Sequence, residues 1–298
     1  MGPRGMSSLS VSPPRAARRT HKARRQINGK LLFYRFFTFA YLALLAFPLF
    51  WMLEMAFKRR IDITSVPPKI FFQPVLDNFV YLTSHGDTLA PIERSLWISF
   101  LSVGLSLIVG AMAAFALARF RWFRQKDIEF FIVSTRMMPP VAVIIPYYSI
   151  FISFHLLDNP IALAFVYLLV DLPLVIWLLL GFFRTIPRDL DNAARIDGAN
   201  TLQVFWYIDL PLVKGGLVTA GIIAFLFTWG ELFFAFILTS VNRTFPVALL
   251  SFLAVGLEVQ YGPMAAAGII AIIPSILMAV FARQAIILGF KGLAGVSE

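Results

Sequence analysis

The 298-residue sequence contains no cysteine, and only 14% of its residues are charged. The lack of cysteine excludes disulfide bonds and thiol chemistry, although it says little about the compartment. Soluble domains average about 25% charged residues, so this chain has too little polar surface to cover a water-soluble globule. Its hydrophobic fraction is 59% and its mean hydropathy is +0.80. These values indicate an integral membrane protein.

Six long apolar runs account for the hydrophobic content, and a helix needs about 18 to 25 such residues to cross a bilayer. The runs lack the period-two alternation of barrel strands, which excludes a β-barrel. Backbone groups in lipid must be satisfied within their own segment, which favours helices. We therefore predict an all-α membrane protein with six transmembrane helices, near residues 33–56, 95–118, 130–154, 160–183, 216–239 and 262–285.

The net charge of +10 is distributed unevenly along the chain. Eight of the first thirty residues are basic and none is acidic. If the N-terminus is cytoplasmic, six helices return the C-terminus to the cytoplasm. The inner segments then carry 18 basic residues and the outer segments 6. This asymmetry fits the positive-inside rule, so the charge indicates orientation and no nucleic-acid partner is expected. We predict a disordered basic cytoplasmic tail at 1–30, a six-helix transmembrane domain at 31–290 and a cytoplasmic tail at 291–298.

One polar segment, at 184–214, separates the fourth and fifth apolar runs. Gly198 can adopt a positive φ and end a first short helix. Asn200 or Thr201 can cap a second helix, which should stop before Pro211 because the residue preceding a proline avoids the helical region. The segment therefore predicts a helix–turn–helix on the cytoplasmic side.

The sequence of this segment, IPRDLDNAARIDGANTLQVFWYIDLPLVKGG, resembles the EAA loop of bacterial ABC-importer permeases. The family pattern is roughly I-P-x-E-L-E-E-A-A-x-I-D-G-A, followed by F-x-x-I-x-L-P. Further segments are similar to carbohydrate permeases of the maltose type: PPVAVIIPYYSIFISFHLLDN, FTWGELFFAFILTS, RTFPVALLSFLAVG and GFKG. The resemblance implies a type I ABC importer permease fold, with this chain as the shorter permease subunit of a binding-protein-dependent, inner-membrane transport system.

In that family the loop is a coupling helix that docks on a separate ATP-binding subunit. The resemblance assigns this role to Leu190, Asn192, Ala193, Ala194, Asp197, Gly198 and Ala199. Asn192 stands where the family pattern has the glutamate of its Glu-Ala-Ala triplet, so a charge used in docking by relatives is missing. The Ala193–Ala194 pair should allow another backbone to approach closely.

The chain lacks a G-x-x-x-x-G-K phosphate loop, so the energy for transport must come from another polypeptide. The resemblance implies the following partners: a second permease in a heterodimer, two copies of an ATP-binding subunit that holds ATP and magnesium, an extracytoplasmic solute-binding protein and the bilayer. No cofactor is expected in this chain. The expected location is the bacterial cytoplasmic (inner) membrane, with both termini in the cytoplasm.

Four polar or aromatic residues within the apolar runs are candidates for the substrate path, because charges within a membrane are costly. Arg136 either lines the cavity or extends to the interface. Asp171 either accepts sugar hydroxyls, or caps a half-helix that begins near Pro173, or pairs with a partner helix. Trp229 and Glu231 either bind a sugar ring and its hydroxyls or pack against the second permease. No catalytic or metal-binding constellation is predicted.

The predicted function is therefore a non-enzymatic transport subunit for a carbohydrate, polyol or glycoside. The alternative is a self-contained secondary transporter or channel, which would show a sequence repeat and paired charges in several helices. A membrane enzyme is disfavoured because no set of His, Asp and Glu gathers on one side of the membrane.

Overall fold

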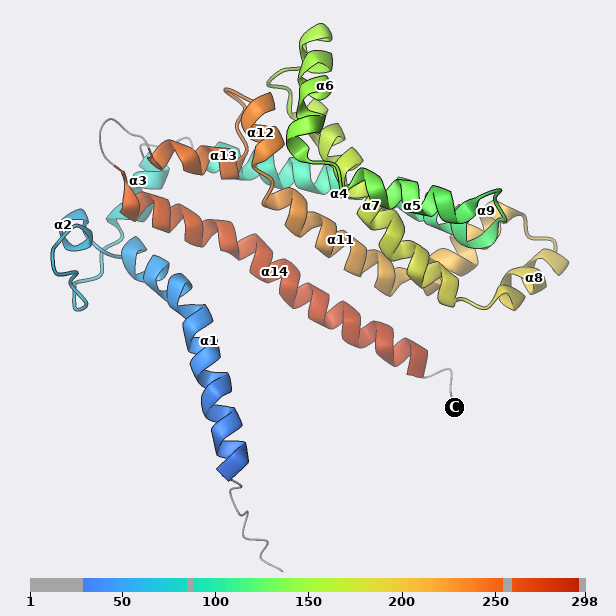
Figure 1. Ribbon diagram of the computed structural model, residues 1–298, viewed down its shortest axis with the longest axis horizontal. Helices are drawn as coiled ribbons and strands as arrows, with labels where there is room; N and C mark the ends of the chain where they lie inside the picture. Colours follow the sequence, from blue (N-terminus) through green and yellow to red (C-terminus); the bar gives the residue numbers. More distant parts are fainter. Residues whose placement is uncertain (1–28, 85–87, 254–258, 295–298) are drawn as a thin grey trace, which may run out of the picture. The chain divides into compact units, whose positions relative to one another are not determined.

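The computed structural model describes residues 29–84, 88–253 and 259–294, and it describes side chains from residue 32 to residue 281 within those ranges. Most of the predicted N-terminal tail and the last four residues lie outside the described residues. Every regular element in the described part of the chain is helical (Figure 1). The helices are α1 (Gly29–Ala56), α2 (Arg60–Ile63), α3 (Asp77–Ser84), α4 (Leu89–Arg119), α5 (Gln125–Thr135), α6 (Pro140–Ser153), α7 (Pro160–Thr185), α8 (Arg188–Ile196), α9 (Thr201–Val204), a π turn (Phe205–Asp209), α10 (Leu210–Leu212), α11 (Lys214–Trp229), α12 (Phe233–Leu238), α13 (Phe245–Leu249), a 3₁₀ turn (Leu250–Leu253) and α14 (Tyr261–Ala294).

The chain divides into two compact units, Met1–Pro48 and Leu49–Glu298. In the first unit, α1 presents large apolar side chains that are all exposed, among them Phe36 and Phe39. An apolar helix with no polar face is suited to lipid or to another apolar helix and not to water. The site described below lies in the second unit.

Among the described residues, four helices are long and apolar enough to cross a membrane, namely α1, α4, α7 and α14. They match four of the six predicted runs. Two bent pairs, Gln125–Thr135 with Pro140–Ser153 and Thr201–Leu212 with Lys214–Trp229, raise the number of spans to as many as six if each pair counts as one.

The break in the third run follows from its two prolines. α5 ends at Thr135 and α6 begins at Pro140, with a bend of 83° between the two helices. A proline lacks the N–H that an internal helical position needs, and Pro140 therefore fits the first position of a new helix. The run at 130–154 is therefore not one continuous helix, because it is interrupted before Pro140.

The fifth run was predicted as one helix, and this is wrong. α11 ends at Trp229, and α12 begins at Phe233, after a gap of three residues. The carboxylate of Glu231 accepts hydrogen bonds from the backbone N–H of Phe234 (2.9 Å) and of Ala235 (3.3 Å). Glu231 thus satisfies the free N–H groups at the start of α12, so the chain can interrupt its helix inside an apolar run.

Small residues allow α4 and α7 to pack closely. Gly110 of α4 is buried against Val175 of α7, where an added Cβ would lie 2.6 Å from the Val175 Cγ1. The hydroxyl of Ser106, one turn earlier, donates to the backbone carbonyl of Leu168 (3.5 Å). Small side chains at the contact bring helix backbones together, as is common between membrane helices.

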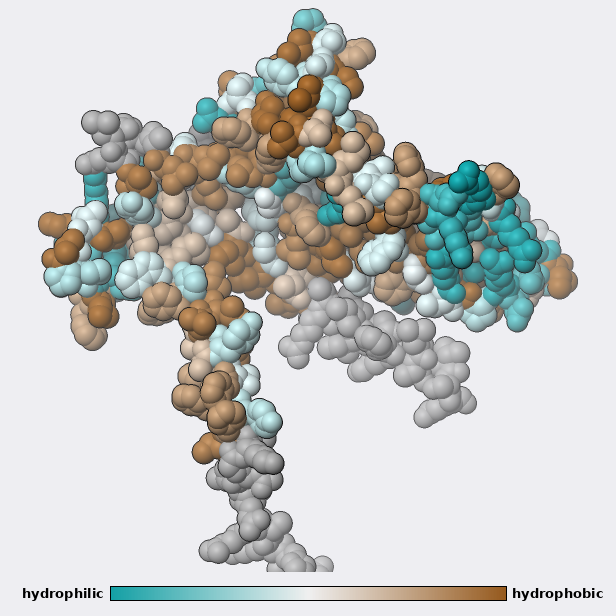
Figure 2. All heavy atoms as spheres, viewed as in Figure 1, coloured by the Kyte–Doolittle hydropathy of each residue, from teal (hydrophilic) through white to brown (hydrophobic). Residues whose placement is uncertain are grey.

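Two apolar clusters hold the second unit together. The larger joins α4, α7, α11 and α14, with Phe183 and Phe225 among its most buried side chains. The smaller joins α6, α7 and α12 and includes Phe151 and Phe234. Polar side chains gather instead near α8 and the start of α5, at the end of the unit where α4 and α7 finish (Figure 2).

Candidate functional site

The polar segment folds into the predicted helix–turn–helix, referred to below as the α8–α10 hairpin (residues 188–212). Gly198 follows α8 with a φ of +91°, a conformation that glycine adopts without strain. Asn200 accepts from the backbone N–H of Gln203 (2.9 Å), and the Gln203 side chain accepts from the N–H of Asn200 (2.8 Å). This capping box begins the second helix where the sequence predicted a cap.

The second helix does not stop before Pro211, contrary to the prediction. After α9 the chain widens into a π turn from Phe205 to Asp209, and helix continues through Leu210–Leu212. The N–H of Leu210 bonds to the carbonyl of Phe205, five residues earlier. The widened turn accommodates the proline ring, which would clash in a regular α-helix.

A buried arginine at the end of α4 holds both limbs of the hairpin. Arg119 donates to the carboxylate of Asp209 through Nε (3.0 Å) and Nη2 (2.9 Å). Its Nε also lies 2.8 Å from Oδ2 of Asp191 in α8, and Nη1 donates to the carbonyl of Ile186 (3.2 Å). The side chains of Arg119, Asp191 and Asp209 are 4%, 7% and 0% exposed. We call these three residues the Arg119 cluster.

Asp191 is the less satisfied of the two carboxylates. Its Oδ1 is buried without a hydrogen-bond partner. Burial and the charge of Asp209 raise the pKa of Asp191 above its ordinary value of 3.8, while Arg119 and Arg195 oppose the rise. Asp191 therefore points into this chain and does not substitute for the glutamate that the family has at position 192.

The outer face of α8 is exposed. Five of the predicted docking residues are exposed and Ala199 is half-buried; the exposed ones are Leu190, Asn192, Ala193, Asp197 and Gly198. Ala194 is only 9% exposed, so its side chain packs inside the chain. Of the two alanines, only Ala193 is open to the approach of another backbone.

In the interior, Asp171 of α7 is 2% exposed and accepts a hydrogen bond from the hydroxyl of Thr228 at the end of α11. α7 runs unbroken past Pro173, so Asp171 does not cap a half-helix there. Arg136, between α5 and α6, is half-buried; its Nη1 donates to the carbonyl of Val170 (3.2 Å) and its guanidinium lies 4.6 Å from the centre of the Phe227 ring. Within the described residues, no three His, Asp or Glu side chains are grouped as a metal site would require.

Trp229 is 5% exposed, and its ring is already packed. It stacks on the Phe225 ring with the ring centres 6.1 Å apart, and the tilted Phe245 ring lies at 6.0 Å. The indole N–H donates to the carbonyl of Ala271 (2.9 Å). Glu231 is half-buried and holds the start of α12 as described above. Both residues therefore have structural contacts within this chain.

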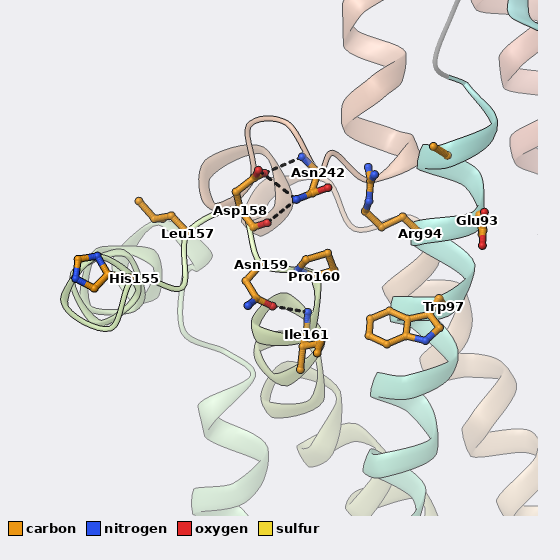
Figure 3. Close-up of a pocket in the computed structure, with 11 residues that line it drawn as sticks. Glu93, Arg94, Trp97, His155, Leu157, Asp158, Asn159, Pro160, Ile161 and Asn242 are labelled. Atoms are coloured by element: carbon orange, nitrogen blue, oxygen red, sulfur yellow. Dashed lines mark hydrogen bonds between the residues drawn. The ribbon is translucent and has the colours of Figure 1, made fainter.

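The end opposite the hairpin contains a recess of about 740 Å³ between the start of α4, the α6–α7 loop and the loop before α13 (Figure 3). Arg94, Trp97 and His155 are among the residues that line it. Asp158 closes one side: its Oδ1 accepts the backbone N–H groups of residues 240 to 242 at 2.8 to 3.0 Å, and its carbonyl accepts from the side chain of Asn242. These bonds join the α6–α7 loop to the loop before α13.

Residues 106–286 match the family model of the binding-protein-dependent transport system inner membrane component. The chain is 35% identical to the permease protein y4oR of Sinorhizobium fredii, over 78% of this chain and 80% of that protein. The chain belongs to this permease family.

Named relatives and a solved structure agree with this membership. The permease is 30% identical to the sulfoquinovosyl glycerol transport system permease protein of Agrobacterium fabrum, over 84% of this chain and 89% of that one. It is 29% identical to the trehalose/maltose transport system permease protein of Thermococcus litoralis, over 82% and 88%. Its fold matches a bacterial ABC transporter involved in the import of alginate, with a TM-score of 0.73, 20% identity and coverage of 85% and 95%.

The predicted type I importer permease fold is thus confirmed, and this permease is a transport component and not an enzyme. The sequence reasoning missed the Arg119 cluster. Arg119 counted only as one basic residue of an inner loop, and Asp209 received no role. The available signal was an arginine at the end of one apolar run and acids in the polar segment, but nothing local to the sequence indicates that they meet.

Proposed function

We propose that this permease is a subunit of an ATP-driven carbohydrate importer, where it forms the translocation path with a second permease and docks through α8 on an ATP-binding subunit present in two copies. The exposed face of α8 carries the proposal. It presents a close-approach residue, Ala193, and an apolar side chain, Ile196, that is 86% exposed. A protruding helix with uncovered apolar surface is suited to a partner protein.

The proposed orientation places the hairpin and both termini in the cytoplasm of a bacterial cell, below its inner membrane. The basic residues support this orientation, because a six-span topology assigns 18 of them to the inner segments and 6 to the outer segments. The opposite end, with the recess near Trp97, then faces an extracytoplasmic solute-binding protein. One of the solved structures of similar fold is an alginate transporter in complex with a substrate-bound periplasmic protein.

The proposed substrate is an oligosaccharide or other glycoside. Relatives named for sulfoquinovosyl glycerol and for trehalose and maltose support this class. Within the path, Arg136 and Glu231 are the more accessible of the four candidate residues, since both are half-buried. We assign substrate contact to these two first, with Asp171 and Trp229 maintaining the packing behind them.

Docking is tested by placing a bulky side chain on the exposed face of α8. Ala193→Trp should greatly reduce capture of the ATP-binding subunit from detergent extracts while leaving the amount of permease in the membrane unchanged. Val241→Trp is the matched control, because Val241 is 80% exposed but lies in the loop before α13, at the opposite end. Equal capture by the two variants would contradict the docking assignment.

Dependence on partners is tested in liposomes. Purified alone, this permease should not move a labelled oligosaccharide down or against an ion gradient, whereas the assembled complex should transport it when ATP is present. Ion-driven uptake by the chain alone would instead support the alternative of a secondary transporter.

With the assembled complex, Arg136→Gln should raise the substrate concentration needed for half-maximal transport without changing the affinity of the binding protein.

A further inference from the structure

The Arg119 cluster is an expensive way to stabilise a fold. It buries one cation with two anions, and removing such charges from water often costs as much as their attraction returns. One carboxylate oxygen of Asp191 remains without a hydrogen-bond partner. Apolar side chains of similar volume would hold the same surfaces together at less cost. Charged hydrogen bonds fix the orientation of the groups that they join, which apolar packing does not do.

That orientation joins three separate pieces of chain. The guanidinium of Arg119 is planar and offers its donors in a rigid fork, so a bidentate contact fixes angle as well as distance. Nε and Nη2 donate to the carboxylate of Asp209 in the π turn, and Nε also faces the carboxylate of Asp191 in α8. Nη1 donates to the carbonyl of Ile186, between α7 and α8. The hairpin is continuous with α7 and α11 along the chain, and this cluster ties both of its limbs to the end of α4 by charged hydrogen bonds.

The end of α4 is itself well anchored. The Arg188 side chain, at the start of α8, donates to the carbonyl of Ala118 (3.0 Å), and the Gln125 side chain donates to the carbonyl of Leu117 (2.6 Å). These bonds satisfy carbonyls that the last turn of a helix leaves free. A positive side chain at this position also complements the negative end of the helix dipole. α4 then continues into the tight contact with α7 near Gly110.

We propose that Arg119 is a positioning residue for energy coupling: it makes the α8–α10 hairpin and α4 move as one body, so that a displacement of the hairpin reaches the membrane-spanning helices. This inference rests on the proposed docking of α8 on an ATP-binding subunit. It assigns to Arg119 no contact with substrate or nucleotide.

The test separates transport from ATP hydrolysis in the assembled complex. Arg119→Lys keeps the charge but loses the fork, so it should lower the number of substrate molecules moved per ATP by about tenfold while ATP hydrolysis and ATPase capture persist. Arg124→Lys is the matched control: Arg124 lies five residues later and its side chain is 70% exposed. It should keep the wild-type ratio. An unchanged ratio in Arg119→Lys would overturn the proposal.

A distance measurement distinguishes positioning from general loss of structure. Because this permease contains no cysteine, Leu202→Cys and Arg121→Cys can carry a pair of spin labels in a complex whose partners are cysteine-free. The label distance should be narrow and identical with and without nucleotide, and it should broaden or shift with nucleotide once Arg119→Lys is added. A wild-type distance that changes with nucleotide would refute movement as one body, as would an unchanged distance in Arg119→Lys.

Two milder variants keep the test decisive if Arg119→Lys fails to reach the membrane. Asp209 accepts two hydrogen bonds and Asp191 faces one nitrogen, so Asp209→Asn should lower the transport ratio more than Asp191→Asn. The reverse order would contradict the assigned geometry. Failure of the docking proposal is recognised separately, because Ala193→Trp would then leave ATPase capture intact whatever the Arg119 variants do.

Discussion

The contact between Gly110 and Val175 makes the packing of α4 on α7 sensitive to a single carbon atom. In Gly110→Ala the new Cβ would lie 2.6 Å from Cγ1 and 3.3 Å from Cβ of Val175, whose side chain is fully buried. Carbon atoms prefer a separation of about 3.5–4.0 Å, so the helices must separate by roughly 1 Å or Val175 must leave its rotamer. Overpacking of this kind costs about 1–3 kcal/mol. We expect a lower thermal unfolding temperature, measured in detergent by tryptophan fluorescence.

Gly104 of the same helix is the matched control, because no atom lies within 4 Å of a Cβ added there. Both variants share the gain of about 0.5–1 kcal/mol that alanine has over glycine in a helix, so their difference isolates the clash. Adding Val175→Ala to Gly110→Ala removes the clashing methyl and should recover much of the loss, which a double-mutant cycle measures. Equal unfolding temperatures for Gly104→Ala and Gly110→Ala would refute the close contact.

Three further predictions concern the hairpin. Asn200→Ala removes the capping box and should destabilise the hairpin by about 1 kcal/mol, seen as faster amide exchange, whereas Asn192→Ala, on exposed α8, should not. Gly198→Ala forces a side chain into a positive φ at a cost of about 1–2 kcal/mol, with the same local readout. Because the pKa of Asp191 is raised in the folded chain, its protonated carboxyl stabilises the fold below pH 3.8. This contribution is lost as the pH rises through the raised pKa. As the pH rises from about 4 through the raised pKa, the unfolding temperature of Asp191→Asn should therefore fall less than that of the wild type.

Features governed by local chemistry were predictable from the sequence. The apolar runs follow from the requirement that backbone groups in lipid be satisfied internally, and four of them are continuous helices. The hairpin turn follows from Gly198, and the start of its second helix follows from Asn200, because a positive φ and an N-cap depend on neighbouring residues only. The π turn that carries helix past Pro211 was not predictable, since it requires a register shift that sequence pattern does not record.

Features that depend on tertiary contact could not be derived. Arg119 and Asp209 are 90 positions apart in the chain, and only the folded arrangement brings their charges together. The inward direction of Ala194 depends on how α8 is rotated against the rest of the unit. The break after Trp229 leaves the hydropathy of its run unchanged, and only the contact of Glu231 with backbone N–H groups reveals it.

The two ends of α7 are held by different means. Asp158, just before the helix, grips the backbone of the loop before α13, and the carbonyl of Ile186, just after it, is held by Arg119. A helix that is held at both ends can follow a relative shift of those ends only by bending where it is least stiff. In α7 that place is Pro173, which has no N–H to donate a backbone hydrogen bond and lies two residues from Asp171. We therefore expect bending of α7 to be concentrated next to the buried carboxylate of Asp171, near the middle of the helix.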